Sequence, residues 1–424
     1  MIVKLPYGRG TWACDVRGLG VVELRPSFPK PRVSPAEQVA EALAHPLERA
    51  PLAQLAAGKR SAVILVPDVT RKAALPTVLP ALFKELARGG IPGERVTLLV
   101  ACGTHPPAAT SLLGDHLGPL PPGLRVVQHD ARDDAQLIAV GRLADGTMVR
   151  LSRLAVNAPL LVSVFPVQHH YFAGFGGGPK MVFPGVAGYE EIQRNHSRVI
   201  DLTVDPPQLH PRCQPGVLAG NPVAEEIAAV AALRPVDFSL ALVLDGQGQP
   251  AWVGAGDGTA VWREAIARVR QWCEIQAGPF AKVLASAGGF PSDYTLIQAH
   301  KALDAASRFL VEGGEMLFLA EMGGGVGSPA MEPFLADPKP EVLAAKLREQ
   351  YVQYGHTTWR IVDKTRRFRI WLKSQLPSGL ASKLGFFPVE QPEKLIESWR
   401  QSSPRETIGL LVNGPVYPRV AALP

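Results

Sequence analysis

The chain is 424 residues long, which at the usual domain size of about 100–200 residues predicts two or three domains with full hydrophobic cores. Apolar residues make up 46% of the sequence and charged residues 19%, a composition that excludes disordered and fibrous proteins. The net charge of +6 is spread along the chain rather than gathered in a tail, so it favours small anionic ligands over nucleic acid.

Neither the cysteines nor the first residues indicate a secreted or membrane protein. The four cysteines lie far apart without any C-x-x-C pair, which argues against a disulfide framework and a zinc ribbon. The opening MIVKLPYGRG lacks the charged and then apolar runs of a signal peptide, and no run of about 18 apolar residues follows. We therefore expect a cytoplasmic protein that has no membrane partner.

A strand, a helix and a second strand are predicted in the first third of the chain. The strands are the buried runs SAVILVP from Ser61 and RVTLLVA from Arg95, and the helix is LPTVLPALFKELAR, which ends before Gly89. This order is a βαβ unit and requires a parallel sheet. A third buried strand is predicted in PLLVSVF, residues 159–165.

The same kind of pattern restarts in the last third of the chain. Before it, we predict a helix near 223–233, a hairpin whose turn is 245–249, and a helix in AVWREAIARVRQW. After residue 279 come the strand AKVLASAGG, a helix over about 292–310 and the strand GEMLFLAE. We predict an α/β fold with two domains, 1–274 and 275–424, each built on βαβ units with a parallel or mixed sheet. The active site is expected in the cleft between them, and the last helix is a candidate to pack back on the first domain.

The run KTRRFRIWLK from Lys364 combines basic and aromatic residues. Such a run occurs in nucleic-acid interfaces and also on the solvated faces of helices. We interpret it as a solvated helix face and expect no nucleic-acid partner.

Polar residues follow three of the predicted strands. They are Asp68, Thr70 and Arg71 after the first, Gly103, Thr104 and His105 after the second, and His169 and His170 after the third. Ligands of open parallel sheets bind outside the carboxyl ends of the strands, so the three sets together predict a site. A single histidine in such a position is more often structural. Arg71 carries a guanidinium that can hold a carboxylate through two parallel hydrogen bonds.

The segment 169–196 is dense in glycine, lysine and histidine. Gly174, Gly176, Gly177 and Gly178 would let the backbone approach an anion closely, and Lys180 follows them. The alternative is a flexible loop with a surface lysine. The residues flanking Lys180 are proline and methionine, which disfavours the phosphate-binding loop and the dinucleotide fingerprint.

Seven motifs, taken in order, resemble the nickel-pincer-nucleotide-dependent lactate racemase family, a group of 2-hydroxy acid racemases and epimerases. The motifs are DVTR at 68–71, GTH at 103–105, HYFAGFGGGPK at 170–180, PGVAG at 184–188, NH at 195–196, GNP at 220–222 and the helix over 293–301. No single motif is specific, but the ordered combination is, and it covers most of the chain.

The resemblance implies a cofactor, a pyridinium-3-thioamide-5-thiocarboxylic acid mononucleotide that grips nickel through two sulfur-containing arms and a ring carbon. It implies that Lys180 carries this nickel-pincer nucleotide covalently and that His196 completes the coordination of nickel, a metal that accepts both imidazole and sulfur. We place Asp68, Thr70 and residues 176–178 (Gly176, Gly177 and Gly178) in the same cofactor site. Cofactor-synthesis enzymes that supply the nucleotide are the expected partners.

The resemblance also implies that His105 and His170 are the catalytic pair. A racemase acts on both faces of one carbon and needs two acid/base groups, for which histidine with its ordinary pKa of about 6.5 is suited. The implied reaction is reversible proton-coupled hydride transfer between the D- or L-2-hydroxy acid and the cofactor, through a 2-keto acid intermediate.

Residues of the second domain are predicted to hold the substrate. Tyr294, Gln298 and Lys301 are spaced four and three apart, which places them on one face of a helix. The resemblance implies that Gln298 and Lys301 hold the carboxylate or keto oxygen, while the alternative for Lys301 is a solvated helix lysine. Trp359 is a further pocket candidate, with a buried core position as its alternative. The family carries an aromatic residue where this chain has Ile297, which favours a range of substrates that includes lactate and larger aliphatic or aromatic 2-hydroxy acids.

Two other functions stay open at this point. His105, His170 and His196 are enough for the zinc site of a hydrolase, although no H-E-x-x-H helix and no evident carboxylate base accompany them. The third possibility is a non-catalytic protein that binds the cofactor or a hydroxy acid. The presence of both His105 and His170 favours catalysis.

Overall fold

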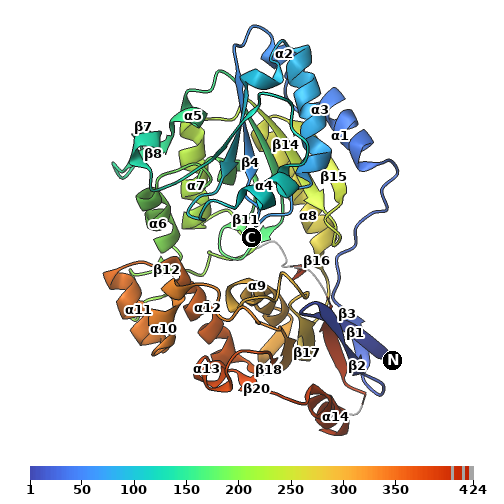
Figure 1. Cartoon of the computed structure of the whole chain (residues 1–424). Helices are drawn as coiled ribbons and strands as arrows, with labels where there is room; N and C mark the ends of the chain where they lie inside the picture. The colour runs from blue at the N-terminus through green and yellow to red at the C-terminus, as the bar shows by residue number, and fades with distance from the viewer. Residues whose placement is uncertain (403–404, 413–415, 420–424) are drawn as a thin grey trace. The chain divides into compact units, whose positions relative to one another are not determined.

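The structure, a computed structural model, describes residues 1–402, 405–412 and 416–419 of the chain (Figure 1). Its contacts separate two compact units. Unit 1 consists of Met1–Ser27, Val199–His210 and Arg270–Pro424, and unit 2 consists of Phe28–Arg198 and Pro211–Val269. Among the described residues, no helix has both the length and the apolar character that crossing a bilayer requires.

Unit 2 is built on a six-stranded mixed sheet in the order β15-β14-β9-β4-β5-β6. All neighbouring strands run parallel except β14 and β15, which form the predicted hairpin. Every residue of β4 is buried, as expected for a strand covered on both faces. The strands are β4 (Ala62–Pro67), β5 (Val96–Ala101), β6 (Arg125–Gln128), β9 (Leu161–Pro166), β14 (Phe238–Leu244) and β15 (Pro250–Gly256).

Helices of unit 2 pack their apolar stripes on this sheet, and α3 is the clearest case. Four of its five buried residues lie three, four, seven and eleven positions along from the first, which is the pattern of one helix face. The predicted βαβ unit of β4, α3 and β5 is confirmed. The helices are α1 (Pro35–Ala44), α2 (Leu52–Ala56), α3 (Leu75–Arg88), α4 (Thr110–Leu117), α5 (Arg153–Val156), α6 (Tyr189–Ser197), α7 (Pro222–Leu233) and α8 (Gly258–Cys273), the last of which continues into unit 1. A separate hairpin is formed by β7 (Leu137–Arg142) and β8 (Met148–Ser152).

Unit 1 contains a second six-stranded sheet, in the order β20-β19-β18-β17-β21-β3, and all of its pairs are parallel. The strands are β3 (Gly20–Glu23), β17 (Phe280–Ser286), β18 (Leu310–Leu319), β19 (Arg369–Lys373), β20 (Phe387–Pro388) and β21 (Thr407–Leu411). The hairpin of β1 (Ile2–Tyr7) and β2 (Gly10–Asp15) belongs to the same unit. The predicted α/β class with parallel and mixed sheets is therefore confirmed.

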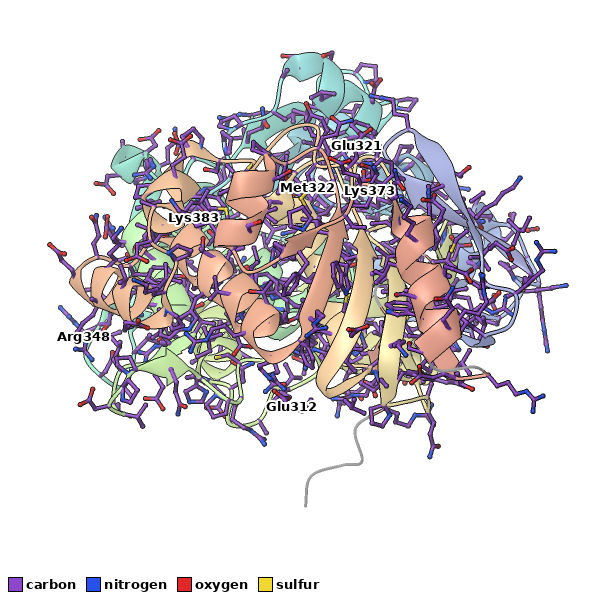
Figure 2. All side chains as sticks on the ribbon, turned by 90° about the horizontal axis from the view of Figure 1, so that it is seen from below. Glu312, Glu321, Met322, Arg348, Lys373 and Lys383 are labelled. Atoms are coloured by element: carbon purple, nitrogen blue, oxygen red, sulfur yellow. The ribbon has the colours of Figure 1, made fainter. Side chains whose placement is uncertain are left out.

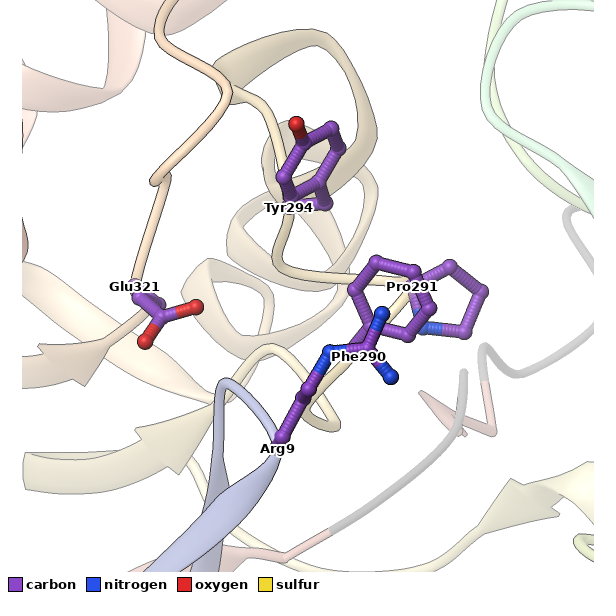
Figure 3. A pocket seen from close by; sticks show the side chains of 5 residues that line it. All are labelled: Arg9, Phe290, Pro291, Tyr294 and Glu321. Carbon is purple, nitrogen blue, oxygen red and sulfur yellow. The ribbon is translucent and has the colours of Figure 1, made fainter.

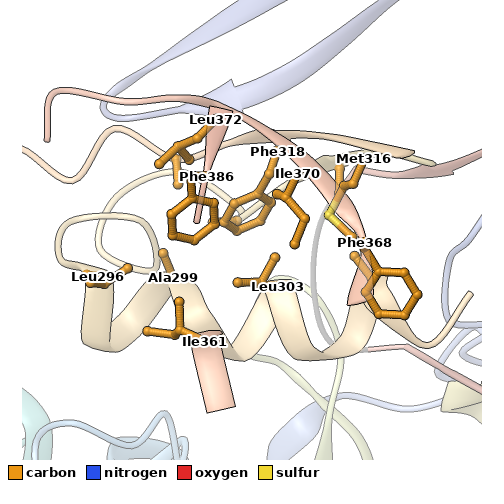
Figure 4. Packing of buried hydrophobic residues seen from close by; sticks show 14 of the residues in the cluster. Leu296, Ala299, Leu303, Met316, Phe318, Ile361, Phe368, Ile370, Leu372 and Phe386 are labelled. Atoms are coloured by element: carbon orange, nitrogen blue, oxygen red, sulfur yellow. The ribbon is translucent and has the colours of Figure 1, made fainter. Parts of the chain in front are cut away.

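The main core of unit 1 lies between its sheet and two helices, α9 and α12. Figure 4 shows Leu296, Ala299 and Leu303 of α9 facing apolar side chains of the sheet, such as Phe318 and Ile370. The helices of this unit are α9 (Leu296–Ser307), α10 (Glu332–Leu335), α11 (Pro340–Glu349), α12 (Gln353–Arg367), α13 (Ser378–Lys383) and α14 (Pro392–Ser402). The last helix contacts β2, where Arg400 donates a hydrogen bond to the carbonyl of Asp15 at 3.0 Å.

The first 27 residues group with the C-terminal part of the chain, which differs from the predicted division at residue 274. The physical reason is that β3 pairs in parallel with β21, so the N-terminal segment completes the edge of the second sheet. A pairing between strands so far apart in sequence leaves no local periodicity from which it could be predicted.

The interpretation of the basic aromatic run as a solvated helix face is wrong. The run begins in the last turn of α12 and continues as β19, whose Ile370 and Leu372 are buried in the core. Lys364 is itself buried, and its Nζ lies 2.8 Å from Oδ1 of Asp304 on α9. In the strand, Arg369 and Lys373 stand at the two ends and the buried Ile370 and Leu372 lie between them.

Candidate active site

The polar residues predicted after three strands lie at one edge of the sheet of unit 2. Strands β9, β4 and β5 are direct neighbours and run parallel, so their carboxyl ends meet at that edge. Asp68 follows β4 immediately, and His105 follows β5 after a short turn in which its N–H donates to the carbonyl of Cys102. The structure thus places Asp68 and His105 after neighbouring strands at this edge.

Asp68 and His105 form a hydrogen-bonded pair. Nδ1 of His105 lies 2.8 Å from Oδ2 of Asp68, while the backbone N–H of Thr70 donates to Oδ1 at 2.7 Å. Burial alone would raise the pKa of Asp68, but the hydrogen bond and charge of His105, the Thr70 hydroxyl and the charge of Arg71 bring that pKa down to about 2. The ionised carboxylate accepts a hydrogen bond from Nδ1–H of His105. In the neutral ring the other nitrogen, Nε2, then carries no proton and can accept one.

His170 has the opposite arrangement of ring nitrogens. It lies in the small hairpin of β10 (His169–His170) and β11 (Gly174–Phe175), where the backbone N–H of Ala173 donates to its Nδ1 at 3.2 Å. A neutral imidazole that accepts at Nδ1 carries its proton on Nε2. His105 is therefore set up to accept a proton and His170 to donate one.

Phe172 is a shared contact of three predicted site residues, and sequence reasoning did not single it out. Its ring centroid lies 4.6 Å from that of His170 and 5.2 Å from that of His196, both edge to face. The Nζ atom of Lys180 lies 5.7 Å from the same centroid. The structure thus brings His170, Lys180 and His196 together around one buried aromatic ring.

Lys180 lies in a short 3₁₀ helix, Gly178–Met181, directly after the glycine segment. Burial of its amine, together with the nearby charge of Arg71, lowers the pKa of Lys180 to about 7. A large fraction of the amine is therefore neutral near physiological pH, and a neutral amine can act as a nucleophile.

His196 is buried on α6, and within the described residues no hydrogen bond of ordinary geometry reaches its Nδ1 atom. Burial and the charge of Lys180 lower the pKa of His196 to about 3, so the ring is neutral and keeps a lone pair for a metal. In the described part of the chain, no three histidine, cysteine, aspartate or glutamate side chains gather as a metal site. The three-histidine zinc site is therefore not assembled in this structure.

The glycine segment before Lys180 is packed against the body of unit 2, so it is not a free loop. A Cβ on Gly177 (φ +70°) would lie 2.7 Å from the Phe165 ring, and one on Gly178 (φ +56°) would lie 2.5 Å from Trp262. Trp262 also donates from its indole N–H to the carbonyl of Gly176 at 3.0 Å. Close packing and left-handed backbone thus explain two of these glycines, and Gly176 has only ordinary contacts.

The predicted substrate residues Gln298, Lys301, Tyr294 and Trp359 all belong to unit 1. Lys301 Nζ donates to Gln298 Oε1 at 2.8 Å, so these two side chains share a face of α9. Tyr294 does not lie on this face, which corrects the predicted grouping of the three residues. The helix is capped by Thr295, so Tyr294 lies before its first turn, where it is 47% exposed. Trp359 is buried in α12, the position given as its alternative.

Residues 7–204 match the family described as the lactate racemase N-terminal domain. The lactate racemase of Lactiplantibacillus plantarum is 29% identical over 339 residues, which cover 79% of this chain and 78% of that protein. The lactate racemase of Thermoanaerobacterium thermosaccharolyticum is 28% identical over 342 residues, covering 80% of this chain and 78% of that protein. The predicted resemblance to the lactate racemase family is confirmed.

Solved structures share the fold. The lactate racemase apoprotein from Thermoanaerobacterium thermosaccharolyticum superposes with a TM-score of 0.86 at 24% identity, over 98% of this chain and 99% of that chain. A protein from Thermotoga maritima superposes with a TM-score of 0.64 at 15% identity, over 93% of this chain and 100% of that chain. At these levels of identity the structural matches establish that this chain has the fold of the lactate racemase apoprotein.

Replacement of Gly178 by alanine is expected to destabilise this lactate-racemase-like chain by about 1–3 kcal/mol, because the new methyl group meets Trp262 and the backbone is left-handed. Urea unfolding followed by circular dichroism measures the loss. Gly146→Ala is the matched control, since Gly146 has φ +82° and no atom within 4 Å of the added Cβ. Equal losses in the two variants would contradict the packing role given to Trp262.

Glu226 holds the helix that carries His196 in this racemase-like unit. Its buried carboxylate accepts from Arg194 at 3.0 Å and from Asn195 at 3.4 Å, and it also pairs with Arg198. Because both arginines are partly exposed, we expect Glu226→Gln to lower the free energy of unfolding by about 1–2 kcal/mol. Asp145→Asn removes an exposed partner of the same arginines and should cost less. Urea denaturation of the two variants tests this order, and a larger loss for Asp145→Asn would refute it.

Proposed function

We propose that this chain is a 2-hydroxy acid racemase or epimerase that uses a nickel-pincer nucleotide. The observation that carries the proposal is the cluster around Phe172, which joins a buried neutral histidine, a partly buried lysine of lowered pKa and a second histidine. The similarity to lactate racemases over about 80% of the chain supports the same reaction class.

The residues around Phe172 fit such a cofactor. Lys180 offers an amine that is partly neutral at pH 7 and suits covalent attachment, and His196 offers a buried, neutral ring for nickel. Gly176 and the strand-end residues Asp68 and Thr70 are the further cofactor-site candidates. When bound, the nucleotide would supply a reversible hydride acceptor, so that the hydroxy acid passes through a 2-keto acid.

The two histidines would move the hydroxyl proton. Nε2 of His105 accepts the proton as the substrate carbon is oxidised, and Nε2–H of His170 can return one from the other side. Asp68 keeps His105 in the accepting tautomer through its hydrogen bond to Nδ1. Arg71 would hold the substrate carboxylate through a charge-assisted pair.

Selection among hydroxy acids is assigned to residues of unit 1. Gln298 and Lys301 present an amide and an ammonium group side by side, which suits a carboxylate or a keto oxygen. Ile297 is only partly buried and apolar, which favours substrates with aliphatic or aromatic side chains larger than the methyl of lactate. Trp359 lies on α12, which packs against α9, and would support the substrate-binding residues of α9 from there. The enzymes that synthesise the cofactor would be its partners, and the cytoplasm its compartment.

The proposal is tested by loading the protein with cofactor and screening chiral lactate, 2-hydroxybutyrate and phenyllactate by chiral chromatography. We expect interconversion of the enantiomers, extending to the larger acids, and activity confined to lactate would refute the role of Ile297. Mass and metal analysis should find nickel together with a thio-nucleotide on Lys180. Zinc alone, with no added mass, would favour the hydrolase instead.

A further inference from the structure

A surface pocket in unit 1 has a composition that the proposed reaction does not use. It has a volume of about 420 Å³ and is lined by Arg9, Phe290, Pro291, Tyr294 and Glu321 (Figure 3). The loop with Phe290 and Tyr294 follows β17, and Glu321 follows β18, so the pocket lies beyond the carboxyl ends of two parallel strands. This is the place where such sheets bind ligands, and the volume is within the usual range of about 300–1,000 Å³.

The walls of this pocket are tied together by the buried carboxylate of Asp293. Its Oδ2 accepts from the backbone N–H of Gly8 at 2.6 Å and from that of Glu321 at 3.2 Å. The N–H of Phe290 donates in turn to the carbonyl of Gly8 at 2.8 Å. Three segments that are distant in sequence are therefore fixed relative to one another, and the pocket is a built feature of the unit.

Two opposite charges face this pocket without neutralising each other. The Cζ atom of the Arg9 guanidinium lies over the Phe290 ring, 4.0 Å from its centroid. Figure 3 shows Glu321 across the pocket from Phe290, and Nε2 of Gln375 donates a long hydrogen bond of 3.4 Å to its carboxylate. Within the described ranges, neither Arg9 nor Glu321 has an ion-pair partner.

Aromatic surface completes the site. Phe290 and Tyr294 are 42% and 47% exposed, which is high for large rings, and their centroids lie 5.6 Å apart in an edge-to-face arrangement. Exposed rings beside fixed charges are typical of sites for small amphipathic molecules.

We propose that this pocket binds a small zwitterion of the α-amino acid class. Its carboxylate would pair with Arg9, its ammonium group with Glu321, and its side chain would lie against Phe290 and Tyr294. A simple anion would meet the Glu321 carboxylate, and a simple cation would meet the guanidinium, so a ligand with both charges suits the site best. The proposal stands apart from the racemase function and assigns Tyr294 to this pocket instead.

Isothermal titration of the full chain with three related probes tests the pocket. L-phenylalanine carries both charges, 3-phenylpropanoate lacks the ammonium group, and phenethylamine lacks the carboxylate. We expect phenylalanine to bind at least about tenfold more tightly than either analogue, since each lost charge-assisted pair is worth about that factor. Arg9→Gln and Glu321→Gln should each weaken phenylalanine binding by about the same factor.

Matched controls separate the pocket from general charge effects. Arg32→Gln changes an exposed arginine of unit 2, and Glu312→Gln changes an exposed glutamate at the other end of the strands from Glu321 (Figure 2). Both should leave binding unchanged, and His105→Ala, which disables the proposed racemase, should leave it unchanged as well. Absence of phenylalanine binding, or equal affinity for the singly charged probes, would overturn the proposal even if one variant failed to fold.

Discussion

Replacement of either His105 or His170 by alanine is expected to lower the rate of racemisation by about 10²–10⁴-fold, the usual contribution of a positioned acid or base. The hydrogen bonds of the two rings give them complementary roles, with a free acceptor on His105 and a proton on His170. Because each direction of the reaction needs one proton removed and one returned, both variants should lose both directions equally. Initial rates from each enantiomer, followed by chiral chromatography, measure the effect.

Measuring how much cofactor each histidine variant carries separates an effect on catalysis from an effect on cofactor binding. Neither histidine is assigned to hold the nucleotide, so mass spectrometry should find the same occupancy of Lys180 as in the unaltered protein. His45→Ala is the matched control, since His45 is an exposed histidine of unit 2 at the end of α1. Racemisation that survives in both loaded variants would refute the assignment of the pair.

Replacement of Lys180 by methionine is expected to abolish retention of the cofactor and also to stabilise the protein at pH 7. Burial and the charge of Arg71 lower the pKa of Lys180 to about 7, against about 10.4 for an ordinary lysine. Below pH 7 the amine of Lys180 is protonated in both the folded and the unfolded chain, and folding then carries the full cost of burying a charge. As the pH rises towards 10.5 the unfolded chain also loses its proton, so the cost disappears.

The gain for Lys180→Met should therefore be on the order of 2–4 kcal/mol at pH 7 and should vanish near pH 10.5. Urea unfolding at the two pH values measures it. Lys59→Met, which changes an exposed lysine of the same unit, should show no such difference. A loss of stability at pH 7, or a gain that grows with pH, would contradict the environment described for Lys180.

Local periodicity was sufficient to predict the elements that build each sheet. The buried run of β4, the helix α3 and the strand β5 were predictable because each has its own apolar spacing. The pairing of β3 with β21 was not, since it depends on contacts between the two ends of the chain. The strand β19 was missed because basic residues hide its short alternation of buried Ile370 and Leu372.

The candidate site was predicted through its polar residues, and the apolar residues that arrange them were missed. His105, His170, Lys180 and His196 stand in recognisable motifs, whereas Phe172 is one aromatic residue among several in the same segment. Trp262 lies 86 residues from Gly176, so its contact with the glycine segment leaves no sequence signal. Likewise, the choice of tautomer at each histidine follows from partners that only the fold brings into place.

The most direct test of the racemase assignment is to follow enantiopure lactate with the cofactor-loaded protein in D₂O. One NMR and chiral analysis of the same sample reports both the enantiomeric composition and the deuterium content at the second carbon. Hydride transfer returns the original hydrogen, so we predict a racemic mixture that keeps protium at that carbon. Lactate that stays enantiopure would contradict the racemase function, and racemic lactate that gains deuterium would contradict the hydride route.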